Sequence, residues 1–313
     1  MPGNASARRP PAAALALLLA LSAAAQAPSA AAQGPAEAGE AAAGPVVVRN
    51  INYDLTPNVQ TFAAVPGRVV SVNGSATEIL LALGVGDRIV GIAYQDNPVL
   101  PEYREAFRRL RALSARYPGR ETVLSLAPDL IVGWHSAFSP QNLGDARYWN
   151  DRGVATYILE DSSPLPYSLE TVLRDIETLG AVFRKDAEAR AIAGRIRSEI
   201  ALARARRAGT APMPRALLLE PYPGGRLRSW GPDSVPGRML EALGAVNAYS
   251  STGERGMESI IASDADAAVF VYMDSTRPES ERLMESFRTD PALRLLRASR
   301  EGRLGLMPLS ECY

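Results

Sequence analysis

Short apolar runs alternate along the chain with stretches in which apolar residues recur every three or four positions. The runs predict strands, and the spaced stretches predict helices. In the first half of the chain the predicted strands lie near residues 46–48, 60–62, 68–72, 88–92, 130–132 and 156–158, and the predicted helices at 75–84, 121–126 and around Tyr148. This order predicts a mostly parallel sheet that helices cover on both faces.

The first predicted helix carries its own start signal. Ser75 and Glu78 have the spacing of a capping box, in which the hydroxyl and the carboxylate satisfy free backbone N–H groups. We therefore expect the helix to begin at Ser75 and to run to Gly84.

A long helix follows near the middle of the chain. Residues 169–183 are amphipathic, and the next stretch, 185–208, contains no proline. At a rise of about 1.5 Å per residue this stretch would be about 35 Å long, which is enough to connect two compact units. The alternative is a surface helix of a single domain.

The strand–helix alternation restarts after this helix, with strands predicted at 215–219 and 268–271 and a helix at 237–243. We divide the chain into an N-terminal lobe at 45–184, a connecting helix at 185–208 and a C-terminal lobe at 209–313. The predicted fold class is α/β, with two Rossmann-like lobes that contain mostly parallel sheets and are joined by a single long helix.

The first residues have the pattern of an export signal. Arg8 and Arg9 precede an apolar run at 12–25 that is too short to span a membrane, and small residues suited to a signal peptidase follow. We assign residues 1–32 to a cleaved signal peptide. A twin-arginine signal is the alternative to the ordinary export route, although two prolines stand where apolar residues are expected. Residues 33–44 contain hardly any large apolar group and predict a disordered leader.

Charge and cysteine content limit the partners and the location. The 34 basic side chains balance the 34 acidic ones, so no overall field attracts nucleic acid or an anionic membrane. The single cysteine, Cys312, is far from the signal, which excludes a disulfide within the chain and predicts no lipid anchor. We expect a freely diffusing monomer in the periplasm.

One pattern occurs in both predicted lobes with the same spacing. Glu121 stands at a predicted helix start eight residues before Asp129, and Glu258 stands eight residues before Asp266. Each aspartate precedes a predicted buried strand. Acidic residues favour helix starts through the helix macrodipole, so chance is the alternative explanation.

Three segments together resemble the substrate-binding proteins of ABC importers for ferric siderophores and cobalamin. They are residues 68–79, residues 83–91 and the stretch 121–130, which includes Ala127-Pro128-Asp129. The resemblance covers nearly everything after Pro66. It implies two α/β lobes joined by one long helix, a ligand cleft between them and little hinge closure.

The resemblance gives the repeated glutamates a role. In that family an exposed glutamate on each lobe meets arginines of the permease, and the matching positions here are Glu121 and Glu258. Charge pairs contribute more to specificity and association rate than to affinity. Two such contacts on separate lobes would fix the orientation of the protein on an ABC permease dimer.

Aromatic residues follow several predicted strands. In open α/β sheets ligands bind beyond the carboxyl ends of the strands, so these residues are candidate ligand contacts. They are Tyr94, Trp134, Tyr222 and Tyr272, together with Trp230 in the loop after Tyr222. Aromatic faces offer the large rigid contact area that a bulky chelate or a corrin ring requires, although each alone could equally belong to the core. The resemblance to the cobalamin-binding branch favours Trp134 and Trp230.

Three arginines favour an anionic ligand. Arg226 and Arg228 flank the Trp230 loop, and Arg116 lies before Glu121 in a loop that faces the cleft in the family. Guanidinium groups pair with carboxylates and stack on aromatic rings. We therefore predict a ferric siderophore as the ligand, with cobalamin or heme as alternatives; solvated surface arginines are the alternative reading.

His135, the only histidine, could complete an open position on a metal. A metal already wrapped by its chelator needs no protein ligand, however, so it joins the candidate ligand contacts and no cofactor of the protein itself is predicted.

The sequence offers no recognisable catalytic constellation. Cys312 has no histidine near it, and a hydrolase nucleophile at Ser75 would need a Gly-x-Ser-x-Gly turn, whose final glycine is missing from residues 73–77. We predict a binding protein rather than an enzyme. A secreted enzyme and a sensor or adhesion module are the alternatives of other classes.

The chain ends at Tyr313, directly after a last predicted strand at 306–309. The resemblance implies a further helix there, so we expect the C-terminal lobe to be truncated.

Overall fold

The computed structural model describes residues 44–95, 98–163, 168–207, 212–222 and 226–309. The predicted signal peptide, the leader up to residue 43 and Cys312 lie outside these ranges. The described chain forms two compact units: residues 44–202 with 308 and 309 form the first, and residues 203–307 form the second. Within the described ranges, no helix combines the length and the apolar character that crossing a membrane requires.

The first unit is built on a parallel sheet of five strands in the order β5-β4-β3-β6-β7. The strands are β3 (Val69–Val72), β4 (Ile89–Ala93), β5 (Ala112–Ser114), β6 (Leu130–Gly133) and β7 (Ala155–Ile158). Every residue of the central strand β3 is buried, as expected for a parallel sheet with both faces covered. After β3, the chain adds β4 and β5 on one side of it and then β6 and β7 on the other.

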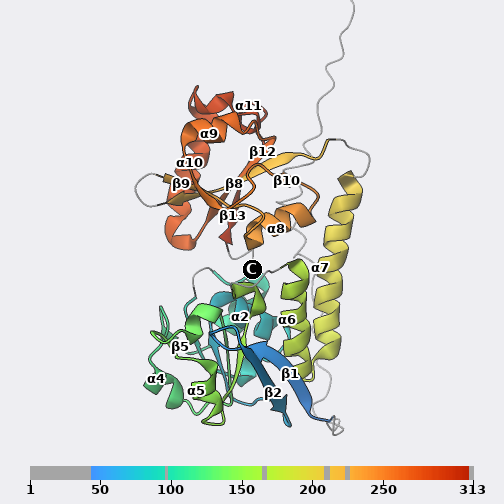
Figure 1. Ribbon diagram of the computed structural model, residues 1–313, viewed down its shortest axis with the longest axis vertical. Coiled ribbons are helices and arrows are strands. Elements are labelled where there is room, and N and C mark those ends of the chain that lie inside the picture. Colours follow the sequence, from blue (N-terminus) through green and yellow to red (C-terminus); the bar gives the residue numbers. More distant parts are fainter. Residues whose placement is uncertain (1–43, 96–97, 164–167, 208–211, 223–225, 310–313) are drawn as a thin grey trace, which may run out of the picture. The chain divides into compact units, whose positions relative to one another are not determined.

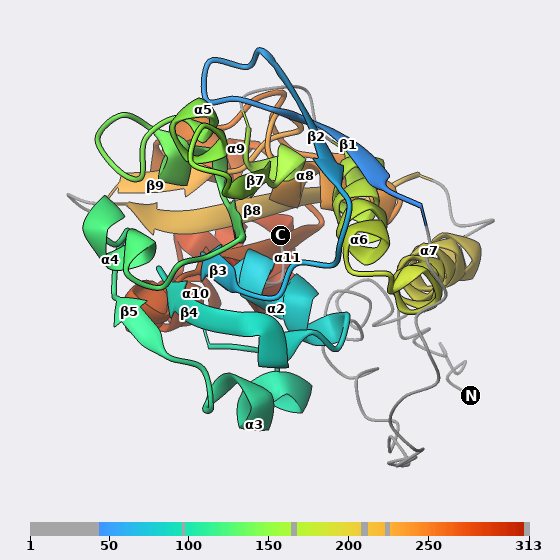
Figure 2. The same cartoon turned by 90° about the horizontal axis from the view of Figure 1, so that it is seen from below.

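Helices cover both faces of this sheet, and Figure 2 shows them on opposite sides. The helices are α2 (Gly74–Ala82), α3 (Arg104–Phe107), α4 (Arg120–Leu124), α5 (Ala146–Asn150) and α6 (Leu169–Val182). On one face Leu80 of α2 and Leu179 of α6 pack with Val69. On the other face Trp149 of α5 packs with Val70. The two apolar clusters hold the sheet between them.

An antiparallel hairpin of β1 (Val46–Ile51) and β2 (Pro57–Phe62) borders the edge strand β7. Asn50 donates a hydrogen bond to the carbonyl of Ile158 at 2.9 Å and accepts one from its N–H at 2.8 Å. Gln60 makes the same pair of bonds with Thr156, at 2.6 and 2.9 Å. An uncovered edge strand exposes unpaired N–H and C=O groups. Here two side-chain amides satisfy that edge as a neighbouring strand would.

The 22-residue helix α7 (Asp186–Arg207) follows α6 in the chain, as Figure 1 shows. A Cβ atom at Gly180 would collide with the side chain of Ala189, so a glycine on α6 permits the close approach of these two helices. The boundary between the two compact units falls within α7, between Leu202 and Ala203. The helix occupies the stretch in which the sequence predicts the connecting helix.

The second unit contains a mixed sheet in the order β11-β9-β8-β12-β13, with β10 also paired to β8. The strands are β8 (Arg215–Tyr222), β9 (Arg226–Ser229), β10 (Val246–Asn247), β11 (Gly253–Arg255), β12 (Ala267–Tyr272) and β13 (Leu304–Pro308), and the helices are α8 (Val235–Ala242), α9 (Met257–Ala262), α10 (Arg277–Thr289) and α11 (Arg297–Arg300). Phe287 of α10 meets Phe270 of β12 edge to face, with the ring centroids 5.2 Å apart. This contact anchors α10 on one face of the sheet.

The predicted α/β fold class is confirmed, with a parallel sheet in the first unit and a mixed sheet in the second. The prediction of a loop around residues 226–230 is wrong in part. Residues 226–229 form β9, which runs antiparallel to β8. An antiparallel neighbour needs only a short connection, so the strand–helix alternation that reveals parallel strands does not announce it.

The predicted capping box is also wrong. Asn73 caps α2, because its side chain accepts a hydrogen bond from the N–H of Ala76 at 3.2 Å. The helix begins at Gly74, so Ser75 lies inside its first turn, and Glu78 accepts the N–H of Leu100 at 2.8 Å instead. Asparagine is as good an N-cap as serine, and here it stands directly at the end of β3.

Candidate functional site

The carboxyl ends of β3, β4 and β6 come together at one edge of the parallel sheet of the first unit. Tyr94 follows β4, and Trp134 and His135 follow β6. Because the chain order reverses around β3, ligands of such sheets bind at this edge. All three residues were predicted as ligand contacts, and the structure places them at the predicted strand ends.

Trp134 is held in place by the start of α2. Its indole N–H donates to the hydroxyl oxygen of Ser75 at 3.0 Å, and the amide of Asn73 donates to the same oxygen at 2.8 Å. With two donors on its oxygen, the Ser75 hydroxyl keeps its own proton for another acceptor. Ser75 was not predicted as a ligand contact, although its position three residues after the buried strand β3 was a usable signal.

Tyr94 takes part in an aromatic group with Trp134. Its ring stacks on that of Tyr117, with centroids 4.7 Å apart and an interplanar angle of 11°, and lies tilted to Trp134 at 6.2 Å. Tyr94 has a positive φ of 54°, which a non-glycine residue adopts only when its surroundings hold it there. Tyr117 was missed because it follows the three-residue strand β5, which the sequence does not reveal. Arg116, beside Tyr117, is exposed and forms no ion pair with any described residue.

His135 turns toward the hairpin loop. Its Nε2 lies 2.7 Å from the backbone carbonyl oxygen of Tyr53, and the two rings stack at 4.6 Å. A carbonyl oxygen only accepts, so Nε2 carries the proton and Nδ1 holds the lone pair. The predicted option of metal coordination by His135 is therefore limited to Nδ1 unless the contact with Tyr53 breaks.

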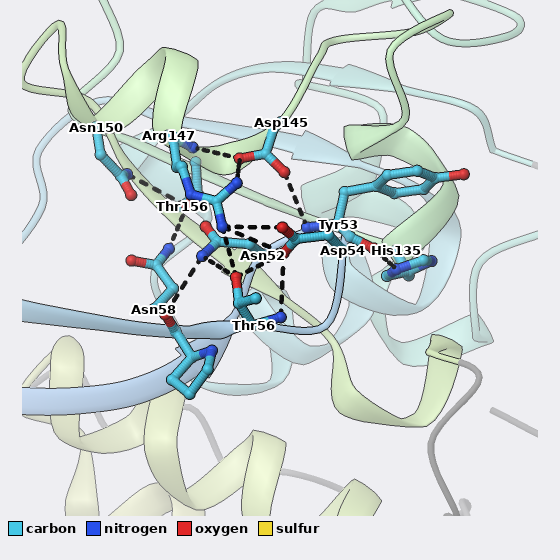
Figure 3. Close-up of polar contacts among 11 residues, drawn as sticks. Asn52, Tyr53, Asp54, Thr56, Asn58, His135, Asp145, Arg147, Asn150 and Thr156 are labelled. Atoms are coloured by element: carbon cyan, nitrogen blue, oxygen red, sulfur yellow. Dashed lines mark hydrogen bonds and ion pairs between the residues drawn. The ribbon is translucent and has the colours of Figure 1, made fainter.

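A polar network connects the same hairpin loop to α5, as Figure 3 shows. Arg147 donates to Asp54 at 3.0 Å and to the hydroxyl of Thr56, and Asp145 accepts the N–H of Tyr53 at 3.2 Å. Hydrogen bonds from Thr56, followed by that from Arg147, lower the pKa of Asp54 to about 2. The side chains of Arg147 and Asp54 are both about half exposed, so solvent weakens their ion pair and it adds little to the free energy of unfolding. The main effect of the network is to fix the hairpin loop that contacts His135.

Two buried carboxyl groups lie behind this edge, near the end of β7. Asp175 on α6 accepts a hydrogen bond from the hydroxyl of Tyr157 at 2.7 Å. Asp161 is 6 % exposed, and one of its oxygens has no hydrogen-bond partner among the described residues. Burial raises the pKa of Asp161 to about 6, and burial with the nearby Asp161 charge raises that of Asp175 well above its ordinary value. Ser162 then accepts the N–H of His135 at 2.8 Å, which joins these acids to the candidate site.

The second unit brings four of the predicted contacts onto one face of β8 and β9. Arg226 pairs directly with Tyr222 across the two strands, and Arg228 is two residues further along the same face. The Arg228 guanidinium carbon lies 4.4 Å from the ring centroid of Tyr222 and 5.2 Å from that of Trp230. The result is a group of aromatic rings with a guanidinium over them.

Both arginines of this face have acidic partners, which the sequence did not reveal. Arg226 is 2.7 Å from Glu254 of β11, and Arg228 is 3.6 Å from Glu220 of β8. The register of β8 and β9 places Glu220 directly opposite Arg228, and Glu254 reaches Arg226 diagonally from β11, where it stands opposite Arg228. The prediction of an anionic ligand loses part of its basis, because these charges are already matched within the protein.

Tyr272 belongs to the other face of the sheet. Phe270 pairs with Leu219, so Tyr272, two residues on, shares the face of Leu219 rather than that of Tyr222. The Arg277 guanidinium carbon lies 5.5 Å from the Tyr272 ring centroid. The structure therefore does not group Tyr272 with the other four predicted contacts of this unit.

The repeated glutamate pattern corresponds to a repeated local structure. Glu121 and Glu258 are each the second residue of a short helix, α4 or α9, that begins after a glycine without a side-chain cap. Both glutamates are exposed, and neither carboxylate pairs with another described residue. The two helices therefore present the same group in the same local setting.

The two aspartates of the repeated pattern, Asp129 and Asp266, also make equivalent contacts in the two units. Asp129 accepts the N–H of Arg68 at 2.9 Å, directly before β3, and Asp266 accepts the N–H of Arg215 at 2.9 Å, at the start of β8. Six residues after each glutamate the backbone takes a positive φ, 44° at Ala127 and 46° at Asp264. Each aspartate thus ties the helix and its following strand to the central strand of its unit.

Within the described residues no group of three or more His, Cys, Asp or Glu side chains could hold a metal ion.

Residues 69–309 match the model of the family described as periplasmic binding protein. A solved periplasmic binding protein from Veillonella parvula is 28 % identical, with a TM-score of 0.78, and the alignment covers 85 % of this chain and 84 % of that one.

Curated relatives give the same picture at lower coverage. An uncharacterized ABC transporter substrate-binding lipoprotein of Bacillus subtilis is 26 % identical over 65 % of this chain, and a vitamin B12-binding protein of Photorhabdus laumondii is 24 % identical over 60 %. The match spans 63 % of the length of each of these relatives.

Solved structures of similar fold bind other chelates. A heme-binding protein of Pseudomonas aeruginosa is 26 % identical, with a TM-score of 0.62 over 79 % of this chain and 85 % of its own. The siderophore-binding protein BauB, solved with acinetobactin and ferric iron, is 22 % identical, with a TM-score of 0.62 over 83 % and 88 %, and shows the fold alone. These are solute-binding proteins rather than enzymes. The chain belongs to the periplasmic binding protein family.

Proposed function

We propose that this protein captures a bulky organic metal chelate outside the cytoplasmic membrane and delivers it to the permease of an ABC importer. The preferred chelate is a corrinoid of the vitamin B12 class. The observation that carries the proposal is the pair of aromatic groups, one at the ligand edge of the first unit and one on the β8–β9 face of the second. Large rigid rings of this kind suit a macrocyclic ligand.

The charge of the second-unit group supports a neutral ligand. Arg226 and Arg228 are each matched by a glutamate, so the face offers guanidinium and aromatic surfaces with little net charge. A vitamin B12-binding protein among the curated relatives supports the same choice. A ferric siderophore, the ligand predicted from the sequence, is the second candidate, because Arg116 beside Tyr117 is exposed and forms no ion pair with a described residue.

The test is a binding competition with the purified mature protein. Cyanocobalamin, a ferric tris-catecholate, ferrioxamine and hemin would each be equilibrated with the protein and the retained absorbance recorded after gel filtration. We expect retention of cyanocobalamin above the others. Retention of a ferric chelate alone would establish the second candidate, and retention of none of the four would refute capture of a metal chelate.

Single substitutions then connect binding to the two aromatic groups. Trp134→Ala and Trp230→Ala should each lower the affinity about tenfold or more, because buried aromatic anchors dominate such contacts. Tyr148→Ala is the matched control. Tyr148 is a partly buried aromatic residue on α5, whose ring contacts the guanidinium groups of Arg120 and Arg152 and belongs to neither aromatic group. An equal loss in all three variants would contradict the assignment.

The hand-over surface is proposed to consist of Glu121 and Glu258. Their exposure, their lack of partners among the described residues and their equivalent helix positions support this role. The double variant Glu121→Ala with Glu258→Ala should reduce ligand uptake about tenfold or more while ligand affinity stays unchanged.

The control for this experiment is Glu102→Ala with Glu279→Ala. These two glutamates are also exposed and also lie in the first turn of a helical segment, one in each unit. Normal uptake in the control and lost uptake in the test variant would support docking through Glu121 and Glu258. Unchanged uptake in both would refute it. Export by a cleaved signal, without a lipid anchor, remains part of the proposal.

A further inference from the structure

A buried glutamate lies under the aromatic group of the second unit. Glu220 stands directly opposite Arg228 in the register of β8 and β9, and the two charged groups approach to 3.6 Å. The side chain of Glu220 is 7 % exposed, whereas that of Arg228 is 29 % exposed. The carboxylate is therefore the inner member of the pair, and the guanidinium is the member that a ligand would meet.

Glu220 has two donors around it. The guanidinium of Arg228 is one, and the indole N–H of Trp230 is the other. Burial raises the pKa of Glu220, while Arg228 and then the Trp230 N–H oppose that rise. Neither the inner oxygen of Glu220 nor the Trp230 nitrogen completes a hydrogen bond of ordinary geometry with a described residue. One carboxylate thus faces both residues, and its charge acts on them at short range.

The other ion pair of this face, between Arg226 and Glu254, is more exposed than the pair of Arg228 and Glu220. Glu254 and Arg226 are 46 % and 55 % exposed, so solvent and salt screen their charges. The Arg226 guanidinium carbon lies 5.3 Å from the Tyr222 ring centroid, whereas that of Arg228 contacts both Tyr222 and Trp230. Glu254 stands opposite Arg228 in the register of β9 and β11, but its carboxylate pairs with Arg226 and is 46 % exposed. Glu220, at 7 % exposed, is therefore the less screened of the two acids beside Arg228.

We propose that Glu220 is a specificity-determining residue, which holds Arg228 against Tyr222 and Trp230 and cancels its charge. With the charge cancelled, the group receives the face of a neutral macrocyclic chelate and disfavours a polyanionic ferric chelate. This inference rests on the proposed function for its ligand, but the charge that it assigns to Glu220 is measurable without any ligand.

The first measurement is fluorescence quenching in a Trp134→Phe background, which leaves Trp230 and the fully buried Trp149. Glu220→Gln keeps the size of the side chain and an acceptor oxygen but removes the charge. Quenching by iodide relative to neutral acrylamide should rise about twofold at low ionic strength, because one uncancelled positive charge then lies beside Trp230. Glu254→Gln should change this ratio much less.

The second measurement is ligand selectivity in the otherwise native chain. Glu220→Gln should raise the affinity for a triply anionic ferric tris-catecholate about fivefold to twentyfold at low salt, and about 0.5 M NaCl should abolish the gain. The affinity for cyanocobalamin should change less than about twofold. Equal weakening of both ligands would make Glu220 a purely structural residue and overturn the inference.

The two measurements separate the two claims. A protein that binds neither ligand but shows the iodide effect would refute the proposed function and leave the charge role of Glu220 standing. A protein that binds cyanocobalamin but shows neither the iodide effect nor the gain for the tris-catecholate would keep the function and overturn the inference.

Discussion

Asp161 gives the most quantitative prediction. The group is buried at the end of β7, and burial raises its pKa from 3.8 to about 6. In the folded protein the carboxyl group therefore binds its proton more tightly than in the unfolded chain. Between about pH 4 and pH 6 this group carries fewer protons in the unfolded state, so its contribution to the free energy of unfolding falls as the pH rises through this window and then stays constant.

The size of the effect follows from that rise in pKa. A shift from 3.8 to about 6 costs the folded state about 3 kcal/mol near neutral pH and about 1 kcal/mol near pH 4.5. Asp161→Asn removes the titration but keeps an acceptor for the backbone N–H groups of Ser162 and of residue 161 itself. The stability gained by the variant should then be at least about 2 kcal/mol larger near pH 7.5 than near pH 4.5, because removing the Asp161 charge also lowers the pKa of Asp175.

This double difference is insensitive to how well the new amide fits, because the fit contributes equally at both pH values. Urea unfolding of the wild type and the variant at the two pH values measures it. Asp151→Asn, at an exposed carboxylate of the same unit, is the control and should change stability by less than about 0.5 kcal/mol at either pH. A gain in Asp161→Asn of the same size at both pH values would refute the reasoning.

Two further predictions concern the frame of the first unit. Asn50→Ala should lower the free energy of unfolding by about 2–5 kcal/mol, because it leaves the buried N–H and C=O of Ile158 unpaired. Urea unfolding measures this loss. The loss should be smaller for Gln60→Ala, because the Gln60 side chain is less buried than that of Asn50. Equal losses would contradict the role of burial. Gly133→Ala should cost about 1–3 kcal/mol by thermal unfolding, since its Cβ would lie 2.8 Å from the backbone carbonyl oxygen of Val72; an unchanged melting temperature would show that β3 and β6 can separate.

The sequence predicted the parallel part of the fold well. Strands such as β3 and β6 are short apolar runs between helices, and the structure contains strands at these runs. The start of α2 was misjudged because Asn73 and Ser75 are both good caps and only the backbone geometry at the end of β3 decides between them. Strands β9 and β11 were missed because β9 consists mainly of charged and polar residues and both join the sheet antiparallel.

The sequence identified many residues of the candidate site, but it did not reveal which of their side chains contact one another. Tyr94 and Trp134 could be named because each follows a visible strand. Glu220 could not be connected with Arg228, because that pairing depends on the register of a strand that the sequence did not reveal. The repeated glutamates are the opposite case, since their spacing is local and the structure repeats it in both units.

The most direct test of the account is calorimetric titration of cyanocobalamin into the mature protein and into its Glu121→Ala, Glu258→Ala double variant. Separate ligand and permease surfaces predict one binding site per chain and the same dissociation constant for both proteins. Absence of binding to the wild type would contradict the proposed ligand, and lost affinity in the double variant would contradict the separation of the two surfaces.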